Sequence, residues 1–326
     1  MIDLHTHTNY SDGTWSLKKL LEEAEKAKIE VLSITDHDTV KPYKELENIE
    51  YKKIYTGEII QGAEFNTVYD GVAFHLLAYD FDYKKLDKWI FENYENKQPN
   101  LENEFKYMLE SCKKNNIKIG DIKYNKEKEW PIDIIFPEIK KYIENKKYFK
   151  EEEWNDIDRF FNSAITNKHF PAFVDFSIHY PKAEEVAKAV RNAGGKLFIA
   201  HAFKYHLDET IQFIEKLKND NIIDGVEVYH SSFDETQTKI LEKYCNENDL
   251  LMSGGSDCHG DKKASRKIGI GYGNMNVKKD ILKKWGIKET IWKQIVSFVY
   301  KINNTKNLYV IYYIIWHIGG TNGKRK

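Results

Sequence analysis

The order of apolar and amphipathic segments is the feature that most restricts how this chain can fold. Apolar runs of strand length alternate with helical patterns through much of its 326 residues. The run IDL precedes SLKKLLEEAEKA, in which apolar residues recur at helical spacing behind Ser16, a candidate N-cap. Further runs of this kind are IEVLSIT, GEIIQGAEF, VAFHLLAY, KLFIA, DGVEVY and LLMSGG. This alternation predicts βα units around a parallel sheet or barrel.

Two parts of the chain break the alternation. Residues 82–170 are rich in Lys, Glu, Asn and aromatic residues and carry helical patterns, so we interpret them as a helical insertion. Residues 277–326 are a C-terminal appendage of unknown role, in which ETIWKQIVSFVYKI predicts an amphipathic helix. The later run LYVIYYIIWHIGG has about a dozen apolar residues, too few to span a membrane. The predicted barrel therefore consists of residues 1–81 and 171–276.

Composition restricts the class of partner and the compartment. Lys plus Arg number 50 and Asp plus Glu number 51, so no net charge attracts duplex nucleic acid or an anionic membrane. The three cysteines, Cys112, Cys245 and Cys258, form no spaced framework, and the N-terminus lacks the pattern of a signal peptide. We therefore expect a cytoplasmic protein whose affinity for phosphate comes from local charge.

Residue types that bind metals gather where the predicted strands end. In parallel barrels the carboxyl ends of the strands meet at one mouth, so these distant segments are expected to converge. A mixture of imidazole and carboxylate suits Zn, Mn or Fe in a catalytic cluster better than a structural thiolate site. The candidate ligands are His5, His7, Asp12, His37, Glu64, His75, His201, Asp257 and His259.

Spacing supports two of these assignments. His5 and His7 are two residues apart, so in extended backbone both side chains face the same way. The same holds for Asp257 and His259, which would leave Cys258 on the opposite side. We therefore expect Asp257 and His259 to be ligands and Cys258 to be a packing residue.

Six segments carry a family resemblance: DLHTHTNYSDGT, ITDHDTV, GAEF, HLLAY, IAH and GGSDCHG. Together they resemble the polymerase-and-histidinol-phosphatase (PHP) family, and more narrowly its stand-alone phosphoesterases of nucleoside phosphates and short RNA. The resemblance covers roughly residues 1–80 and 171–276. It implies an α/β fold, a distorted (β/α)7 barrel with a helical insertion subdomain, and a centre of two to three divalent metal ions, Mn, Fe or Zn.

The resemblance also implies how the metals would be held. One ion would bind His5, His7, Glu64 and Asp257. A second would bind Asp12, His37 and His259. A third would bind Glu64, His75 and His201, so that Glu64 bridges two ions of a trinuclear centre.

Further polar residues lie near these motifs. By the resemblance, His230 would contact the phosphate or protonate the leaving oxygen. Asp36, beside His37, would orient imidazoles or the nucleophile. Lys204 stands in AHAFKY, where the subfamily commonly has an arginine in AHPGRY. Lys204 and Arg266 are candidate phosphate clamps, although lysine orients phosphate less strictly than arginine does.

We therefore predict a metal-dependent hydrolase of phosphate esters that uses a metal-activated hydroxide. Its substrates would be nucleoside phosphates, including 3′,5′-bisphosphates and monophosphates, or short oligonucleotide ends. Histidinol-phosphate phosphatase is the nearest alternative. A carbon–nitrogen amidohydrolase also begins with HxH, but His37, Glu64 and the lack of a bridging lysine argue against it. A non-catalytic domain that binds metal or a partner protein belongs to another class, and retention of all the candidate ligands disfavours it.

Overall fold

The computed structural model describes residues 1–95, 101–125, 130–175, 179–205, 207, 209–263, 266–270 and 275–286. The helix predicted in ETIWKQIVSFVYKI and the apolar run after it lie outside these residues. Residues Met1–Leu282 form one compact unit, which contains the fold described below, and Lys283–Lys326 form a second. Within the described residues, no helix is long and apolar enough to cross a membrane.

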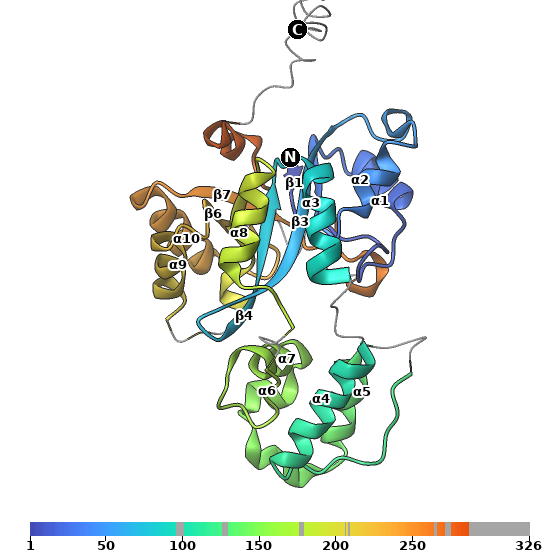
Figure 1. Cartoon of the computed structure of the whole chain (residues 1–326), viewed down its shortest axis with the longest axis vertical. Coiled ribbons are helices and arrows are strands. Elements are labelled where there is room, and N and C mark those ends of the chain that lie inside the picture. The colour runs from blue at the N-terminus through green and yellow to red at the C-terminus, as the bar shows by residue number, and fades with distance from the viewer. Residues whose placement is uncertain are drawn as a thin grey trace, which may run out of the picture. The chain divides into compact units, whose positions relative to one another are not determined.

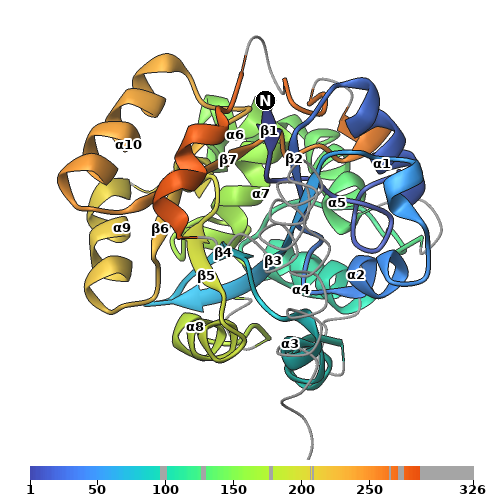
Figure 2. The ribbon, with the colours of Figure 1, turned by 90° about the horizontal axis from the view of Figure 1, so that it is seen from above.

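Seven strands form one sheet in the order β1-β2-β3-β4-β5-β6-β7 (Figures 1 and 2). They are β1 Ile2–Asp3, β2 Val31–Ile34, β3 Glu58–Tyr69, β4 Val72–Tyr79, β5 Lys196–Ile199, β6 Gly225–His230 and β7 Leu251–Gly255. The amide of Leu4, just after β1, donates to the carbonyl of Gly254 in β7 at 3.1 Å, so the two ends of the sheet meet. The predicted distorted seven-stranded α/β barrel is confirmed.

Strand β4 is the source of the distortion. It pairs antiparallel with both β3 and β5, whereas the other neighbouring strands pair in parallel. Asp70 and Gly71 join β3 to β4 with positive φ angles of 52° and 78°, as a two-residue hairpin turn requires. Because β3 continues into this hairpin beyond its pairing with β2, Glu64 and His75 lie inside strands. The expectation that they mark strand ends is therefore wrong.

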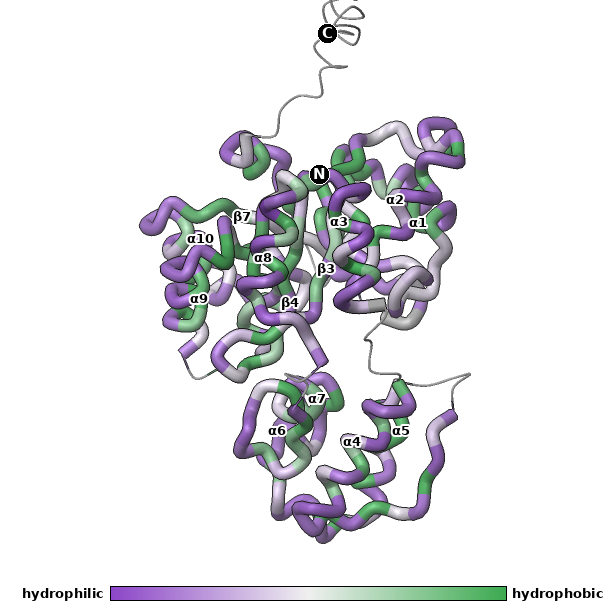
Figure 3. The backbone as a smooth tube through the Cα atoms, in the orientation of Figure 1, coloured by the Kyte–Doolittle hydropathy of each residue, from purple (hydrophilic) through white to green (hydrophobic). Residues whose placement is uncertain are grey.

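In the described part of the chain, helices surround the strands (Figure 2). They are α1 Leu17–Lys26, α2 Lys41–Leu46, α3 Tyr83–Ile90, α8 Ala183–Asn192, α9 Thr210–Asn219 and α10 Glu235–Glu247. Hydrophobic residues concentrate in the strands and alternate with hydrophilic ones along the helices (Figure 3). In α1 the predicted apolar face is buried, and Ser16 caps the helix by accepting a hydrogen bond from the Lys19 amide at 3.3 Å.

Four helices of the predicted insertion enclose a second hydrophobic core. They are α4 Leu101–Lys114, α5 Pro131–Lys140, α6 Glu151–Asn155 and α7 Ile157–Thr166. Phe105, Met108, Ile135 and Phe160 are among the buried side chains of this core. Helix α3 precedes them but packs Leu86 into the barrel core. The described chain also contains short helical turns at Tyr51–Lys53, Phe91–Glu95, Ile143–Tyr148, Ala202–Tyr205, Gly260–Lys263 and Lys279–Trp285.

Candidate metal centre

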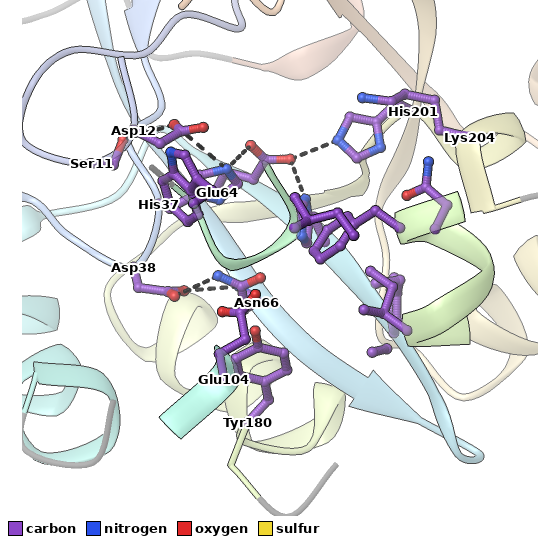
Figure 4. A pocket seen from close by; sticks show the side chains of 18 of the residues that line it. Ser11, Asp12, His37, Asp38, Glu64, Asn66, Glu104, Tyr180, His201 and Lys204 are labelled. Carbon is purple, nitrogen blue, oxygen red and sulfur yellow. Dashed lines mark hydrogen bonds and ion pairs between the residues drawn. The ribbon is translucent and has the colours of Figure 1, made fainter. Parts of the chain in front are cut away.

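The nine candidate ligands come together at one mouth of the barrel, and Figure 4 shows Asp12, His37, Glu64 and His201 among them. Glu64 lies at their centre, with its side chain 1% exposed. Its two carboxylate oxygens face five imidazoles: His5 at 3.0 Å, His7 at 3.2 Å, His37 at 3.5 Å, and His75 and His201 at 2.9 Å each. The antiparallel β4 brings His75 into this group. One carboxylate thus contacts five side chains from four separate segments.

Asp12 and Asp257 complete the cluster on either side of His7. Asp12 Oδ2 lies 2.9 Å from His259 Nε2, and Asp12 Oδ1 lies 3.5 Å from His7 Nδ1. Asp257 Oδ1 lies 3.4 Å from His7 Nε2 and 3.6 Å from His5 Nε2. Every candidate ligand therefore faces at least one other across a short gap.

The donor atoms fit divalent metal ions. His5 Nε2 and His7 Nε2 are 3.1 Å apart, and two neutral imidazole nitrogens at that distance repel one another unless a proton or cation lies between them. Ligands at 2.0–2.2 Å from a Zn-type ion stand roughly 3.0–3.5 Å from each other. Within the described residues, four sets have ligand atoms within 4.8 Å of one another: His7, Asp12, His37 and His259; His5, His230 and Asp257; His5, His7 and Glu64; His37, Glu64 and His75.

These sets match the implied metal sites in part. Asp12, His37 and His259 form one set, as expected, and His7 joins them. His201 belongs to none of the sets, although its contact with Glu64 agrees with the third site. His230 enters a set with His5 and Asp257, which the sequence did not suggest.

Charges within the cluster hold the carboxylates ionised. Burial raises the pKa of Glu64, but the imidazoles of His5, His37 and His75 outweigh burial and hold it well below its usual range. Conversely, burial disfavours the charged form of His7, but the nearby carboxylates of Asp257 and Glu64 raise its pKa to about 9. Protons on histidines thus balance the carboxylates, and divalent ions would compete with these protons for the same atoms.

Glu227 in β6 supports two of the candidate ligands and was missed by the sequence analysis. One of its oxygens lies 2.8 Å from His5 Nδ1, and the other accepts the backbone amide of His201 at 2.7 Å. Carboxylates in this position orient metal-binding imidazoles and raise their basicity. A glutamate inside the apolar run GVEVY was the signal that could have found it.

Asp36 lies behind the centre. It accepts hydrogen bonds from the Thr8 amide at 2.7 Å, from the Thr8 hydroxyl at 2.6 Å and from the Ser11 hydroxyl at 2.5 Å. Those bonds fix the loop that carries Asp12. We therefore interpret Asp36 as a positioning residue.

Two positive side chains and one imidazole hold the second oxygen of Asp257. The buried Arg266 pairs with it, Lys204 Nζ lies 3.5 Å away and His230 Nε2 lies 3.2 Å away. Of these three side chains, Lys204 alone lines the cavity described below. The placement of His230 argues against its predicted role as a proton donor to the leaving oxygen, and that of Arg266 against a direct phosphate clamp. Both fit better as partners of Asp257.

In the segment SDCHG, Cys258 points away from Asp257 and His259 as expected, but the backbone conformation that achieves this differs from the expected one. Asp257 has a φ of 55°, so the chain here is left-handed and not extended. Asp257 and His259 contact the cluster, whereas Cys258 lies in the hydrophobic core. The expected reason for the separation is therefore wrong.

Replacing Cys258 by Ser should leave the metal content and most of the activity unchanged, because this thiol contacts the core and none of the candidate ligand atoms. We expect a modest loss of stability, about 1 kcal/mol, from burying a hydroxyl in place of a thiol. Elemental analysis and thermal denaturation of the variant check both expectations. A large loss of bound metal would place Cys258 in the site.

The cluster opens into a cavity of about 470 Å³. Its barrel wall includes Glu64 and Lys204, and its opposite wall includes Trp130 and Phe161 of the insertion together with Tyr180. A cavity of this size accommodates a small organic phosphate. The site thus combines a multi-ligand centre with room for a substrate whose organic part contacts the insertion.

Comparisons with known proteins agree with this fold. The PHP domain family matches residues 3–153. A 5′-3′ exoribonuclease of Haemophilus influenzae is 26% identical over 275 residues, which covers 79% of this chain and 89% of that protein. The 5′-3′ exoribonuclease Rnm of Escherichia coli is 30% identical over 80 residues, which covers 24% of this chain and 27% of that protein.

Two solved structures share the architecture. A protein from Bifidobacterium adolescentis, named as a metal-dependent phosphoesterase, has a TM-score of 0.58 and 24% identity, covering 86% of this chain and 94% of its own. An amidohydrolase from Chromobacterium violaceum, with bound sulfate and no metal, has a TM-score of 0.58 and 18% identity. The match covers 91% of this chain and 96% of that chain. At these identities the likeness concerns the fold alone.

The matched family, the distorted barrel and the imidazole–carboxylate cluster agree with one another. Residues 3–153 of the chain therefore resemble the PHP domain family. The chain is a hydrolase that acts on phosphate esters.

Proposed function

We propose that the protein removes phosphate from nucleoside phosphates or from the ends of short oligonucleotides. The cluster around Glu64, which opens into a cavity of about 470 Å³, carries the proposal. The exoribonuclease relatives support a nucleotide or RNA substrate over other phosphate esters. Nucleoside monophosphates, 3′,5′-bisphosphates and oligonucleotide ends are the substrates to compare.

The centre would hold two or three ions of Mn, Fe or Zn. The four donor sets share ligands with one another, which supports fewer than four ions, and their imidazole and carboxylate composition supports these metals. When bound, such ions lower the pKa of coordinated water from 15.7 towards ~7 and neutralise charge on the phosphate.

The chain's own residues have separate tasks in this proposal. Glu64 and Asp257 keep their carboxylates ionised at neutral pH and so hold the positive charge in place. Glu227 orients the ring of His5 and the backbone of His201. Lys204 lines the cavity beside Asp257 and attracts the phosphate dianion.

Lys204→Ala should raise KM more than it lowers kcat, because a flexible point charge contacts phosphate about equally in the ground and transition states. Lys204→Arg should keep or sharpen the discrimination between bisphosphates and monophosphates, because guanidinium binds phosphate bidentately. The measurement is kcat/KM for nucleoside bisphosphates, nucleoside monophosphates and histidinol phosphate in the three proteins. Identical kinetics would remove Lys204 from the site. A preference for histidinol phosphate of roughly a hundredfold, or ~2.8 kcal/mol, would overturn the nucleotide assignment.

A further inference from the structure

Glu104 of helix α4 is a buried carboxylate that the proposed chemistry does not use. Its side chain lines the cavity, yet the residue is only 8% exposed. Among the described residues, none forms a hydrogen bond or ion pair with it. Within the described residues, no hydrogen bond or ion pair offsets the cost of desolvating this carboxylate.

The position of Glu104 separates it from the metal centre. Figure 4 shows Glu104 beside Tyr180, at the end of the pocket opposite Glu64 and His201. Asp38 and Asn66 lie between the two ends, and they bond to each other, from Asn66 Nδ2 to Asp38 Oδ2 at 2.6 Å. A phosphate held at the metals would therefore place its organic part, and not the reacting atoms, near Glu104.

The walls of the cavity suit a hydrogen-bond donor better than a second phosphate. Asp133 and Asp158 line the cavity together with Glu104, and both come from the insertion. Among the described lining residues there is one lysine, Lys204, and no arginine, and Figure 4 shows Lys204 near His201. Trp130 and Tyr180 add aromatic surface for a planar group. Burial raises the pKa of Glu104 to about 7, so an N–H donor would relieve the cost of its charge.

We propose that Glu104 is a specificity-determining residue, which accepts a hydrogen bond from an N–H donor on the organic part of the phosphate ester. The amino group of a nucleobase is the donor that fits a carboxylate next to aromatic side chains. This inference rests on the proposed function, because it assumes that the phosphate lies at the metal centre. It adds to that function that the insertion selects the organic part of the substrate.

The test compares phosphate esters whose organic parts differ in their hydrogen-bond donors. Adenosine 5′-monophosphate carries an amino group, purine riboside 5′-monophosphate has the same rings without it, and ribose 5-phosphate has no base. We expect the metal-loaded protein to prefer the first over the second by about tenfold in kcat/KM. Glu104→Met should abolish this preference and leave ribose 5-phosphate hydrolysis unchanged, and Glu104→Gln, a neutral acceptor, should lie between.

Glu110→Gln is the matched control, since Glu110 lies on the same helix and is exposed. Met and Gln both fit a buried helical position, so thermal denaturation should show no loss of stability in either Glu104 variant. Histidinol phosphate is a further arm, because a larger effect of Glu104→Met on this ester would identify an alkyl ammonium as the preferred donor. A merely structural role would change all esters equally.

Two results would overturn the inference while leaving the phosphoesterase assignment intact: equal changes for every ester, or no change for any. Absence of phosphate release from all esters would instead contradict the proposed function. In that case the affinities of the two purine nucleotides, measured by calorimetry for the same variants, still decide the role of Glu104. Equal affinities in all variants would reject it.

Discussion

Replacing Glu64 by Gln should lower kcat/KM for any phosphomonoester by at least roughly a thousandfold and remove at least one equivalent of bound metal. Within the described residues, no other change of a single carboxylate affects as many candidate ligands, because Glu64 contacts five imidazoles from four segments. The Gln side chain keeps the shape of Glu64 but lacks the negative charge that would balance the metal ions at two sites of the centre. Elemental analysis after reconstitution, together with phosphate release, measures both effects.

Glu58→Gln provides the matched control for this variant. Glu58 lies on the same strand, β3, and its side chain is 40% exposed, where it faces Lys279 at 3.5 Å. An exposed ion pair of this kind contributes about 0–1 kcal/mol, so metal content and rate should stay unchanged. A Glu64→Gln protein that retains full metal content and activity would show that Glu64 does not bridge the metal sites.

Removing the metals with a chelator should abolish hydrolysis and destabilise the protein. Ions that bind only the folded state add about 4 kcal/mol when their free concentration is 1,000 times Kd. We expect the unfolding temperature to fall on chelation and to recover when Mn, Fe or Zn is added back. Differential scanning calorimetry and phosphate release measure the two effects on the same sample.

The size of this destabilisation should depend on pH. Without metal, carboxylates raise the pKa of His7 to about 9 against the opposing effect of burial, so its proton stabilises the fold below pH 6.5. That contribution is lost as pH rises through about 9. Burial lowers the pKa of His37 to about 3, so this group adds no further change above pH 6.5. The gap in unfolding temperature between loaded and metal-free protein should therefore widen from pH 7 to pH 9.

A gap that is constant or shrinks over that range would mean that protons and metals do not compete for the His7 ring. Hydrolysis that survives complete chelation would contradict a metal-dependent mechanism altogether. The two outcomes are separable, because the first concerns binding and the second concerns the reaction.

The barrel could be predicted from sequence because its signal is local. Strand-length apolar runs and amphipathic helices alternate, and the contacts of Leu20 and Ile34 within one core follow from that pattern. The direction of β4 could not be predicted in this way, since periodicity is the same for parallel and antiparallel strands. For that reason the sequence placed Glu64 and His75 at strand ends, although they lie inside β3 and β4.

The candidate site was predictable where ligand types recur in short motifs, and less so where contacts arise from tertiary packing. The nine predicted ligands do come together, and their binding of metal stays a prediction. Glu227, by contrast, is a single acidic residue in an apolar strand, and only the fold brings it to His5 and His201. Likewise, the sequence identified Arg266 as a charge near the site but could not indicate that Asp257 would bury and pair it.

Release of inorganic phosphate by the reconstituted protein is the measurement that tests the account most directly. The protein, loaded with Mn, Fe or Zn, is incubated with nucleoside monophosphates, 3′,5′-bisphosphates, 5′-phosphorylated oligonucleotides and histidinol phosphate, and each kcat/KM is compared with that of the chelated protein. We expect metal-dependent release that is greatest for the nucleotides or oligonucleotides. Metal binding at two or more sites without phosphate release from any ester would contradict it and would favour a non-catalytic metal-binding domain.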